Sequence, residues 1–389
     1  MRHIQTPIFV RQIRKWCLSL FKNKRWISGW IKAMSPISTE RVSDHMTNIN
    51  QATGLAEGSF GIGTYRLSDE SNPFPGLVQP DGTVFDLSHV YADTHAIFND
   101  WDRALDTLVD IAAKGGETGI RFAEVHILTP LSHPNILGAG SNYKQHVAEM
   151  MTNNKFNQEN RLPGESDEDF FNRNYAEVAQ RAEKGMPFFW TGMHSALCGA
   201  NDDILLPLIG EQMEFELELG VVVARTDRYV PPEEADDLIA GYVIINDLGA
   251  VDEFRRADIK FGFDWVSKNQ PNHFPTGPFI VPKQFVQWDE VQIVLKVNGK
   301  IMQDWPTNDM IFSPQKILSY ASERVKLLPG DLLSTGSPPG NAGQHGGAWL
   351  KDGDIVESTL TGLGWQRNRV VNEDAKGRKP TFGPFITKM

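Results

Sequence analysis

The chain has 389 residues, of which 40% are hydrophobic and 22% charged, and its formal net charge is −11. This composition is typical of one or two globular domains, and no apolar run approaches the roughly 18–20 residues of a membrane-spanning helix. The acidic balance argues against nucleic-acid binding, which needs a basic face. The chain has only two cysteines, so a disulfide framework is not expected, and this content fits a reducing compartment.

The first 34 residues differ from the rest in charge, because they hold eight Lys or Arg and no acid. Three interpretations are open: an organelle-targeting presequence, an amphipathic segment at a membrane surface, or sequence upstream of a start codon at Met34 or Met46. A polar stretch follows. We treat residues 1–56 as an extension and linker that need not belong to the fold, and we predict a cytoplasmic protein, with organelle targeting as the alternative.

Short strands and turns characterise residues 57–130, for which we predict a small α+β domain. Gly61–Leu67 has a strand pattern, and Asp81-Gly82 marks a hairpin turn. A helix is expected near Trp101–Ala113. Its apolar stripe would consist of Leu105, Leu108, Val109 and Ala112.

A second domain, residues 131–389, starts with a strand over Ile136–Tyr143 that runs into a Gly-rich turn. The next segment has a helical pattern with His146 and Glu149 at i and i+3. This spacing lets the carboxylate hold the imidazole and raise its basicity, as a general base requires. Surface ion pairs often have the same spacing. Further on, Ser166 and the acids after it predict a helix N-terminus. The apolar stripe of that helix would consist of Phe170, Phe171, Tyr175 and Val178.

Acidic and apolar residues alternate over residues 214–219, which predicts a strand entering a sheet. Residues two apart share a face, so Glu214, Glu216 and Glu218 would lie together. A second apolar strand ends in Asn246-Asp247. Carboxylates that converge from separate strands form a hard-oxygen site, which suits Mg²⁺, Mn²⁺ or Ca²⁺ better than zinc. The alternatives are a solvated edge strand and ordinary turn chemistry.

The C-terminal part continues with strands and turns. Val291–Val297 is a predicted strand that turns at Asn298-Gly299, and a helix is expected near Pro314–Val325. Leu328–Asp331 opens another strand, which ends at Thr335-Gly336. Glycine N–H groups in that loop could face an anion, and an ordinary loop is the alternative.

Taken in order, seven segments resemble the signatures of the fumarylacetoacetate hydrolase family over residues 131–370. They are Gly140-Ser-Asn-Tyr143-x-x-His146-x-x-Glu149, Glu216-x-Glu218-Leu219, Gly241-Tyr242 through Asn246-Asp247, Lys268 with Pro275-x-Gly277-Pro278, Asn298-Gly299-x-x-x-Gln303, Pro329-Gly330-Asp331 and Thr335-Gly336-Ser337-Pro338. The resemblance implies an α+β fold, a catalytic domain with a mixed β-roll or β-sandwich-like core, and a homodimer.

The resemblance also implies roles for individual residues. The matched positions are Glu216, Glu218 and Asp247 for a divalent metal, commonly Mg²⁺; His146, Glu149 and Lys268 for catalysis; and Tyr143, Gln303 and Thr335 for substrate binding. In relatives the lysine stabilises developing enolate charge. Residues 151–186 resemble an insertion behind the His–Glu dyad. Val251 and Phe254 stand where relatives have Arg and Gln, which implies a larger or more apolar pocket.

We therefore predict a divalent-metal-dependent enzyme that hydrolyses a C–C bond in a β-diketo acid, such as an acylpyruvate or fumarylacetoacetate, in the catabolism of aromatic compounds or amino acids. One alternative is isomerisation or decarboxylation of a 2-oxo or 2-hydroxy-dienoic diacid at the same site. Another is a non-catalytic, ligand-binding relative. The partner we expect is a small-molecule acid, and the family signatures do not choose among these substrates.

Overall fold

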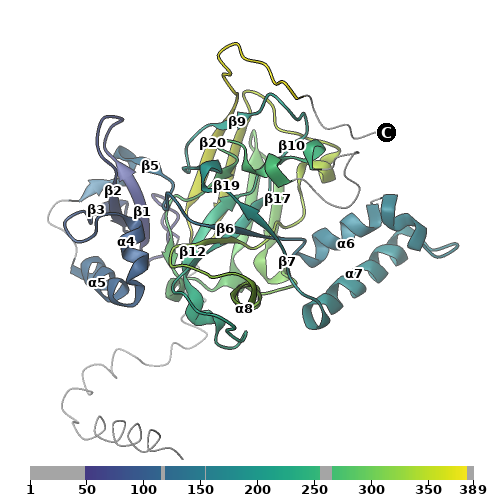
Figure 1. The fold of residues 1–389 in the computed structure, drawn as a ribbon, viewed down its shortest axis with the longest axis horizontal. Helices are drawn as coiled ribbons and strands as arrows, with labels where there is room; N and C mark the ends of the chain where they lie inside the picture. The colour runs from purple at the N-terminus through teal and green to yellow at the C-terminus, as the bar shows by residue number, and fades with distance from the viewer. Residues whose placement is uncertain (1–48, 115–118, 154, 255–264, 383–389) are drawn as a thin grey trace, which may run out of the picture. The chain divides into compact units, whose positions relative to one another are not determined.

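The computed structural model describes residues 49–114, 119–153, 155–254 and 265–382 (Figure 1). They belong to one compact unit of the chain. The interpretations of the basic head fall on residues 1–48 and lie outside the described part. None of the described helices is long and apolar enough to cross a membrane.

A five-stranded antiparallel sheet is formed by the N-terminal part, in the order β4-β3-β2-β1-β5. Its elements are β1 Gly61–Arg66, β2 Phe74–Val78, β3 Thr83–Asp86, β4 Ile120–Arg121, β5 His126–Leu128, α4 Thr94–Asn99 and α5 Trp101–Lys114. The predicted Asp81-Gly82 turn joins β2 to β3, and Gly82 has a φ of 89°. Whether residues 57–130 form a separate domain stays a prediction.

The helix predicted near Trp101–Ala113 is confirmed as α5, but its buried face differs from the predicted stripe. Trp101, Ala104 and Leu108 are buried, whereas Val109 is 42% exposed. The prediction for Val109 is therefore wrong. Trp101, at the first helical position, packs on the core, so the buried face of the helix is the one that carries Trp101. Successive residues point in different directions around a helix, and Val109 lies off that face.

Two further sheets form most of the remainder of the described unit. The six-stranded sheet has the order β15-β12-β11-β18-β6-β7, and the five-stranded sheet has the order β17-β16-β19-β20-β9. The strands are β6 Ile136–Gly140, β7 Phe188–Gly192, β9 Ile204–Leu206, β11 Leu217–Val223, β12 Ile239–Asn246, β15 Val281–Pro282, β16 Gln292–Val297, β17 Lys300–Pro306, β18 Leu332–Ser334, β19 Ile355–Leu360 and β20 Trp365–Asn372. Strand β11 packs against β16, and β12 against β19, so the sheets form a sandwich-like core.

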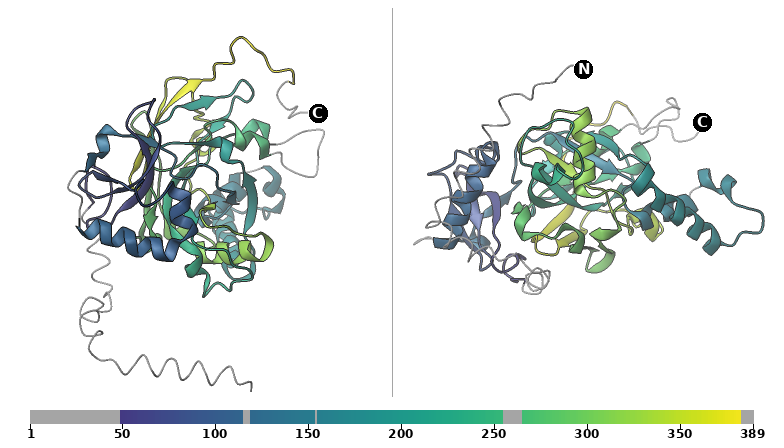
Figure 2. Two further views of the ribbon diagram at one scale, coloured as in Figure 1. Left: turned by 60° about the vertical axis from the view of Figure 1, so that its left-hand side comes forward. Right: turned by 90° about the horizontal axis from the view of Figure 1, so that it is seen from below.

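Three further helices of the described residues lie outside these sheets. They are α6 Lys144–Asn153, α7 Asp167–Lys184 and α8 Pro314–Arg324. As predicted, the Ser166 side chain caps α7, accepting a hydrogen bond from the Asp169 N–H at 3.1 Å. Helices α6 and α7 pack on each other and project from the sheets as a hairpin (Figures 1 and 2). The residues predicted as an insertion therefore supply the second arm of this hairpin.

The strand predicted over residues 214–219 is interrupted. Strand β10 (Met213–Glu214) pairs with β13 (Gly249–Ala250) and ends before Phe215, whereas β11 begins at Leu217. In the gap, the Glu216 N–H donates to the Asn246 side-chain oxygen at 3.0 Å, and the Glu216 carbonyl accepts from the Asp247 N–H at 2.8 Å. The uninterrupted strand we predicted is therefore wrong, because the Glu216 N–H bonds a side chain instead of a neighbouring strand; the predicted buried face of Phe215, Leu217 and Leu219 is confirmed.

Candidate active site

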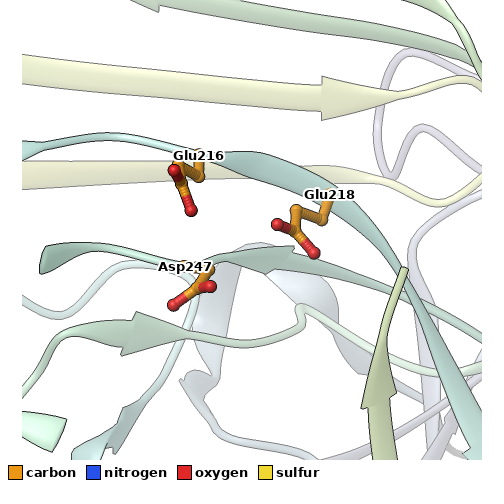
Figure 3. A group of neighbouring side chains, drawn as sticks. All are labelled: Glu216, Glu218 and Asp247. Carbon is orange, nitrogen blue, oxygen red and sulfur yellow. The ribbon is translucent and has the colours of Figure 1, made fainter. Parts of the chain in front are cut away.

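Three acidic side chains meet where β11 begins and β12 ends, two interior strands of the six-stranded sheet (Figure 3). Glu216 lies in the gap before β11, Glu218 lies on β11, and Asp247 follows β12. One carboxylate oxygen from each lies within 4.8 Å of the others. Among the described residues, no other group of three His, Cys, Asp or Glu side chains is as well placed to hold an ion. Strands β11 and β12 are antiparallel neighbours, so their pairing brings the predicted metal residues together.

Lys268, in the short helical turn Trp265–Asn269, lies inside this cluster and is 4% exposed. Its Nζ is 2.6 Å from Glu216 Oε2, 2.9 Å from Asp247 Oδ2 and 3.3 Å from the Asp247 carbonyl oxygen. Burial alone would lower the pKa of Lys268, but the two carboxylates outweigh burial and raise it. The Trp190 and Phe254 rings flank the ammonium, with centroids 5.6 and 5.5 Å from Nζ. The lysine is therefore charged and fixed in position.

Glu218 is held by the last residue of β18 and by the loop that follows this strand. The Ser334 hydroxyl and the Gly336 N–H both donate to Glu218 Oε2, the latter at 2.7 Å. Gly336 has a φ of 98°, which favours glycine. Its N–H does face an anion, as the loop pattern suggested, and in the structure that anion is the Glu218 carboxylate.

The charge balance of the cluster fits a bound cation. Three carboxylates surround one lysine, and burial with mutual repulsion raises the pKa of Glu218. Burial, only partly offset by Lys268, raises the pKa of Asp247 to about 7. The buried Asp247 Oδ1 has no hydrogen-bond partner among the described residues. Buried acids without a partner are costly, and an all-oxygen donor set suits Mg²⁺, Mn²⁺ or Ca²⁺.

His146 and Glu149 lie on α6, as predicted, but they do not form the expected direct hydrogen bond. Among the described residues, Glu149 Oε1 accepts from Gln145 Nε2 at 2.6 Å and Glu149 Oε2 accepts from Gln344 Nε2. The buried His146 Nδ1 has no partner in the same part of the chain. The i,i+4 spacing aligns Gln145 with Glu149 at least as well as i,i+3 aligns His146, which explains the difference. Burial lowers the pKa of His146, and the nearby Glu216 charge opposes this shift.

The 3₁₀ turn Ala342–His345 contributes residues that the sequence analysis missed. Asn341, its N-cap, donates through Nδ2 to Glu216 Oε1 at 3.2 Å, and Gln344 reaches Glu149 on α6. The Asn341-x-x-Gln344 spacing is a capping-box pattern. That pattern could have located the turn, but not the two acids that it contacts.

The residues predicted to bind substrate lie in the wall around the acids. Gln303 is fully buried; its Oε1 accepts from the Leu217 N–H at 3.0 Å, and its Nε2 donates to Asn341 Oδ1 at 3.0 Å. The Thr335 hydroxyl donates to the Leu219 carbonyl at 2.8 Å. Burial and the Glu218 charge raise the pKa of Tyr143, whose hydroxyl has no partner among the described residues. Substrate contact by these three side chains stays a prediction.

The fold and the site together define a sheet-rich α/β protein with a carboxylate cluster that could hold a cation. Residues 135–371 match the family model described as fumarylacetoacetate (FAA) hydrolase C-terminal. The chain belongs to the fumarylacetoacetate hydrolase family, whose members are hydrolases and isomerases, and it is an enzyme of this class. The resemblance inferred from the sequence is confirmed.

Two relatives illustrate the range of this family. The chain is 30% identical over 313 residues to the 2,4-didehydro-3-deoxy-L-rhamnonate hydrolase of Sphingomonas sp. (strain SKA58), with 78% of this chain and 94% of the relative covered. It is 37% identical over 209 residues to an uncharacterized protein of Pyrococcus abyssi, with 52% of this chain and 89% of that protein covered.

Solved structures share the fold at lower identity. The maleylpyruvate hydrolase of Sphingobium sp. SYK-6, in complex with manganese(II) and pyruvate, has a TM-score of 0.60 and 20% identity, with 81% of this chain and 100% of that chain covered. The 2-hydroxyhepta-2,4-diene-1,7-dioate isomerase of Mycobacterium marinum has a TM-score of 0.55 and 23% identity, with 82% and 100% covered. These likenesses support the mixed, sheet-rich fold that the sequence predicted.

Proposed function

We propose that this protein is a divalent-metal-dependent hydrolase that cleaves a C–C bond in a β-diketo acid. One observation carries the proposal: the buried Asp247 Oδ1, which has no hydrogen-bond partner in the described part of the chain, lies in a cluster with Glu216 and Glu218. Such an arrangement leaves negative charge that Lys268 alone does not neutralise. Glu216, Glu218 and Asp247 would hold the metal, with Mg²⁺ as our first choice and Mn²⁺ or Ca²⁺ as alternatives.

When bound, the metal would supply Lewis-acid polarisation of a substrate carbonyl. Burial of the His146 ring nitrogen lowers the pKa of this side chain, which favours the neutral ring, so His146 accepts a proton from water and the resulting hydroxide attacks that carbonyl carbon. The C–C bond then breaks, and its electron pair leaves as the enolate of the departing fragment. The Lys268 ammonium stabilises this negative charge. Protonated His146 returns the proton to the enolate carbon, which completes the hydrolysis.

Several finer assignments belong to the same proposal. The Sphingomonas relative is named as a hydrolase of 2,4-didehydro-3-deoxy-L-rhamnonate, which makes that compound a test substrate here. The manganese(II) and pyruvate named for the Sphingobium hydrolase support a metal and a small 2-oxo acid. We also propose a homodimer, a cytoplasmic location and a role in aromatic-compound catabolism.

Turnover of defined substrates tests the proposal. The purified protein is mixed with acylpyruvates, fumarylacetoacetate and 2,4-didehydro-3-deoxy-L-rhamnonate, with Mg²⁺ or with a chelator, and the products are identified by mass. We expect cleavage that disappears with the chelator and in Glu216→Ala and His146→Ala. Unchanged turnover in both variants would refute the assignment of the site.

Isomerisation or decarboxylation is the second candidate. The observation that favours it is the apolar wall beside Lys268, where the Phe254 ring lies 5.5 Å from Nζ and packs on Trp265 at 5.2 Å between ring centroids. An apolar wall excludes water from the reacting carbon. A product of unchanged mass would identify an isomerase, and loss of CO₂ would identify a decarboxylase.

A further inference from the structure

The Gln344 side chain has a fixed orientation at the C-terminal end of its turn. Its Oε1 accepts hydrogen bonds from the Gly340 N–H at 2.6 Å and from the Asn341 N–H at 3.0 Å. An amide whose oxygen is held by two backbone donors must direct its NH₂ group to the other side. In the structure that side is helix α6.

The Gln344 side chain bonds one member of the predicted dyad and lies near the other. Its NH₂ group donates to Glu149 Oε2, and the same side chain opposes the lowering of the pKa of His146 that burial causes. The second Glu149 oxygen is occupied by Gln145 at 2.6 Å. The carboxylate is therefore oriented by two amides, and Gln344 is the one that reaches it from outside helix α6.

The turn that carries Gln344 is tied to the acid cluster as well. Asn341 donates to Glu216 Oε1 at 3.2 Å, and its Oδ1 accepts from the buried Gln303 at 3.0 Å. The Gly343 N–H donates to Glu214 Oε1 at 3.1 Å. One short turn thus contacts the acids on the β10–β11 side and the dyad on α6.

We propose that Gln344 is a positioning residue, which holds Glu149, and through helix α6 also His146, in register with the acid cluster by donating from its NH₂ group to Glu149. This inference rests on the proposed function, because it assigns the base to His146. It replaces a directly bonded His–Glu dyad with a Glu149 carboxylate that is held by an amide from the turn. A donor at position 344 is then required for fast proton transfer, whereas the fold requires only the acceptor oxygen.

Gln344→Glu separates these two requirements. The glutamate keeps an oxygen for the Gly340 and Asn341 N–H groups but presents a carboxylate, instead of a donor, to Glu149. We expect kcat to fall about 10–100-fold with little change in KM, the range typical when a supporting hydrogen bond is lost, while the melting temperature stays near that of the wild type. The matched control is Gln315→Glu, since Gln315 Nε2 donates to Asp236 Oδ1 at 3.1 Å on an exposed surface; its kcat should not change.

A second test exchanges the donor and the acceptor between positions 344 and 149. In Gln344→Glu combined with Glu149→Gln, a donor again faces an acceptor. We expect the double variant to lose less kcat than the product of the two single losses, which is the signature of direct coupling. Losses that simply multiply, or a Gln344→Glu variant with wild-type kcat, would overturn the proposal.

Hydrogen exchange keeps this inference separate from the proposed function. If the wild type turns over no diketo or 2-oxo acid, the proposed function fails, but the contact can still be tested. We expect faster amide exchange over residues 144–153 in both Gln344→Glu and Gln344→Met than in Gln315→Glu, because α6 loses its tie to the turn. Equal exchange in all variants would show that Gln344 positions nothing.

Discussion

Lys268 contacts two different atoms of Asp247: its Nζ lies 2.9 Å from Oδ2 and 3.3 Å from the carbonyl oxygen of the same residue. The third contact of the ammonium is Glu216 Oε2 at 2.6 Å. One lysine therefore joins the end of β12 to the gap before β11. These are the two places from which the acids converge, so Lys268 both shapes the site and limits its negative charge.

Removing this cation should make the fold depend on metal. In Lys268→Met, the buried Asp247 and the partly buried Glu216 lose the ammonium that pairs with them, and breaking a buried ion pair costs about 3–5 kcal/mol. We expect this loss in the free energy of unfolding with a chelator present, and a larger rise in melting temperature on adding Mg²⁺ than in the wild type. Urea denaturation with and without Mg²⁺ measures both quantities.

Lys283→Met is the matched control for that prediction. Lys283 pairs with Asp236 at 2.7 Å, but the two side chains are 28% and 55% exposed. An exposed pair contributes about 0–1 kcal/mol, so this variant should be nearly as stable as the wild type and should not respond to Mg²⁺. Equal losses in the two lysine variants would contradict a special role for Lys268.

The hydrogen bond from Ser334 to Glu218 should stabilise the protein, whereas the hydroxyl of another buried serine, Ser358, should not. The Ser334 hydroxyl donates to Glu218, and hydrogen bonds to charged groups contribute about 1.5–3 kcal/mol. Ser334→Ala should lose about that much stability and weaken Mg²⁺ binding measured by calorimetry. Ser358 is also fully buried, but its hydroxyl has no partner among the described residues. Ser358→Ala should therefore be neutral or slightly stabilising, and a larger loss there than at Ser334 would refute the argument.

Features set by neighbouring residues could be predicted from the sequence. The Asn298-Gly299 turn is confirmed between β16 and β17, where both residues have positive φ, 51° and 76°. Ser166 caps α7 as predicted. Periodicity also located α5, because an amphipathic pattern is a property of adjacent residues, and the helix predicted near Pro314–Val325 is confirmed as α8.

Features set by distant residues could not be predicted. The Asn341–Glu216 and Gln344–Glu149 contacts join residues 125 and 195 positions apart, and no local pattern encodes such a pairing. The interruption of the strand at Glu216 has the same origin, since Asn246 competes for its N–H. Family resemblance identified the acids, but the amides that orient them are brought there by contacts between distant segments.

Gly336 should tolerate alanine less well than a glycine with similar backbone angles. An added Cβ would lie 2.8 Å from Asn142 Cβ and 2.9 Å from the Ala139 carbonyl oxygen, and φ is 98°. Gly353 has a φ of 88° with no atom within 4 Å of the same position. Gly353→Ala should cost about 1 kcal/mol from backbone strain alone. Gly336→Ala should cost about 1–3 kcal/mol more from steric overlap.

The readout for this pair is urea denaturation together with Mg²⁺ titration. Because the Gly336 N–H donates to Glu218, a shifted loop should also weaken metal binding, whereas Gly353→Ala should bind Mg²⁺ like the wild type. Equal destabilisation of the two variants would mean that the loop around Gly336 shifts to accommodate the added methyl group with no loss in the free energy of unfolding.

His273 should make stability depend on pH in the acid range. The ring is fully buried, and its Nε2 donates to the Leu205 carbonyl at 2.9 Å. Burial lowers the pKa of His273 to about 4, below the usual value of 6.5. The unfolded chain therefore binds a proton at a higher pH than the folded chain does. The stabilising contribution is complete above pH 6.5 and is lost as the pH falls to about 4; it amounts to about 3 kcal/mol at about 1.4 kcal/mol per pKa unit.

His273→Gln removes this titration while keeping a side-chain N–H for the Leu205 carbonyl. We expect the free energy of unfolding of the wild type to fall more steeply between pH 6.5 and 4 than that of the variant, by about 3 kcal/mol over the range. Urea denaturation at half-unit pH intervals, with a chelator present in both samples, measures the two slopes. Parallel slopes would show that His273 binds its proton in the folded protein over the same pH range as in the unfolded chain. Burial next to the Lys268 charge makes the protonated state unfavourable.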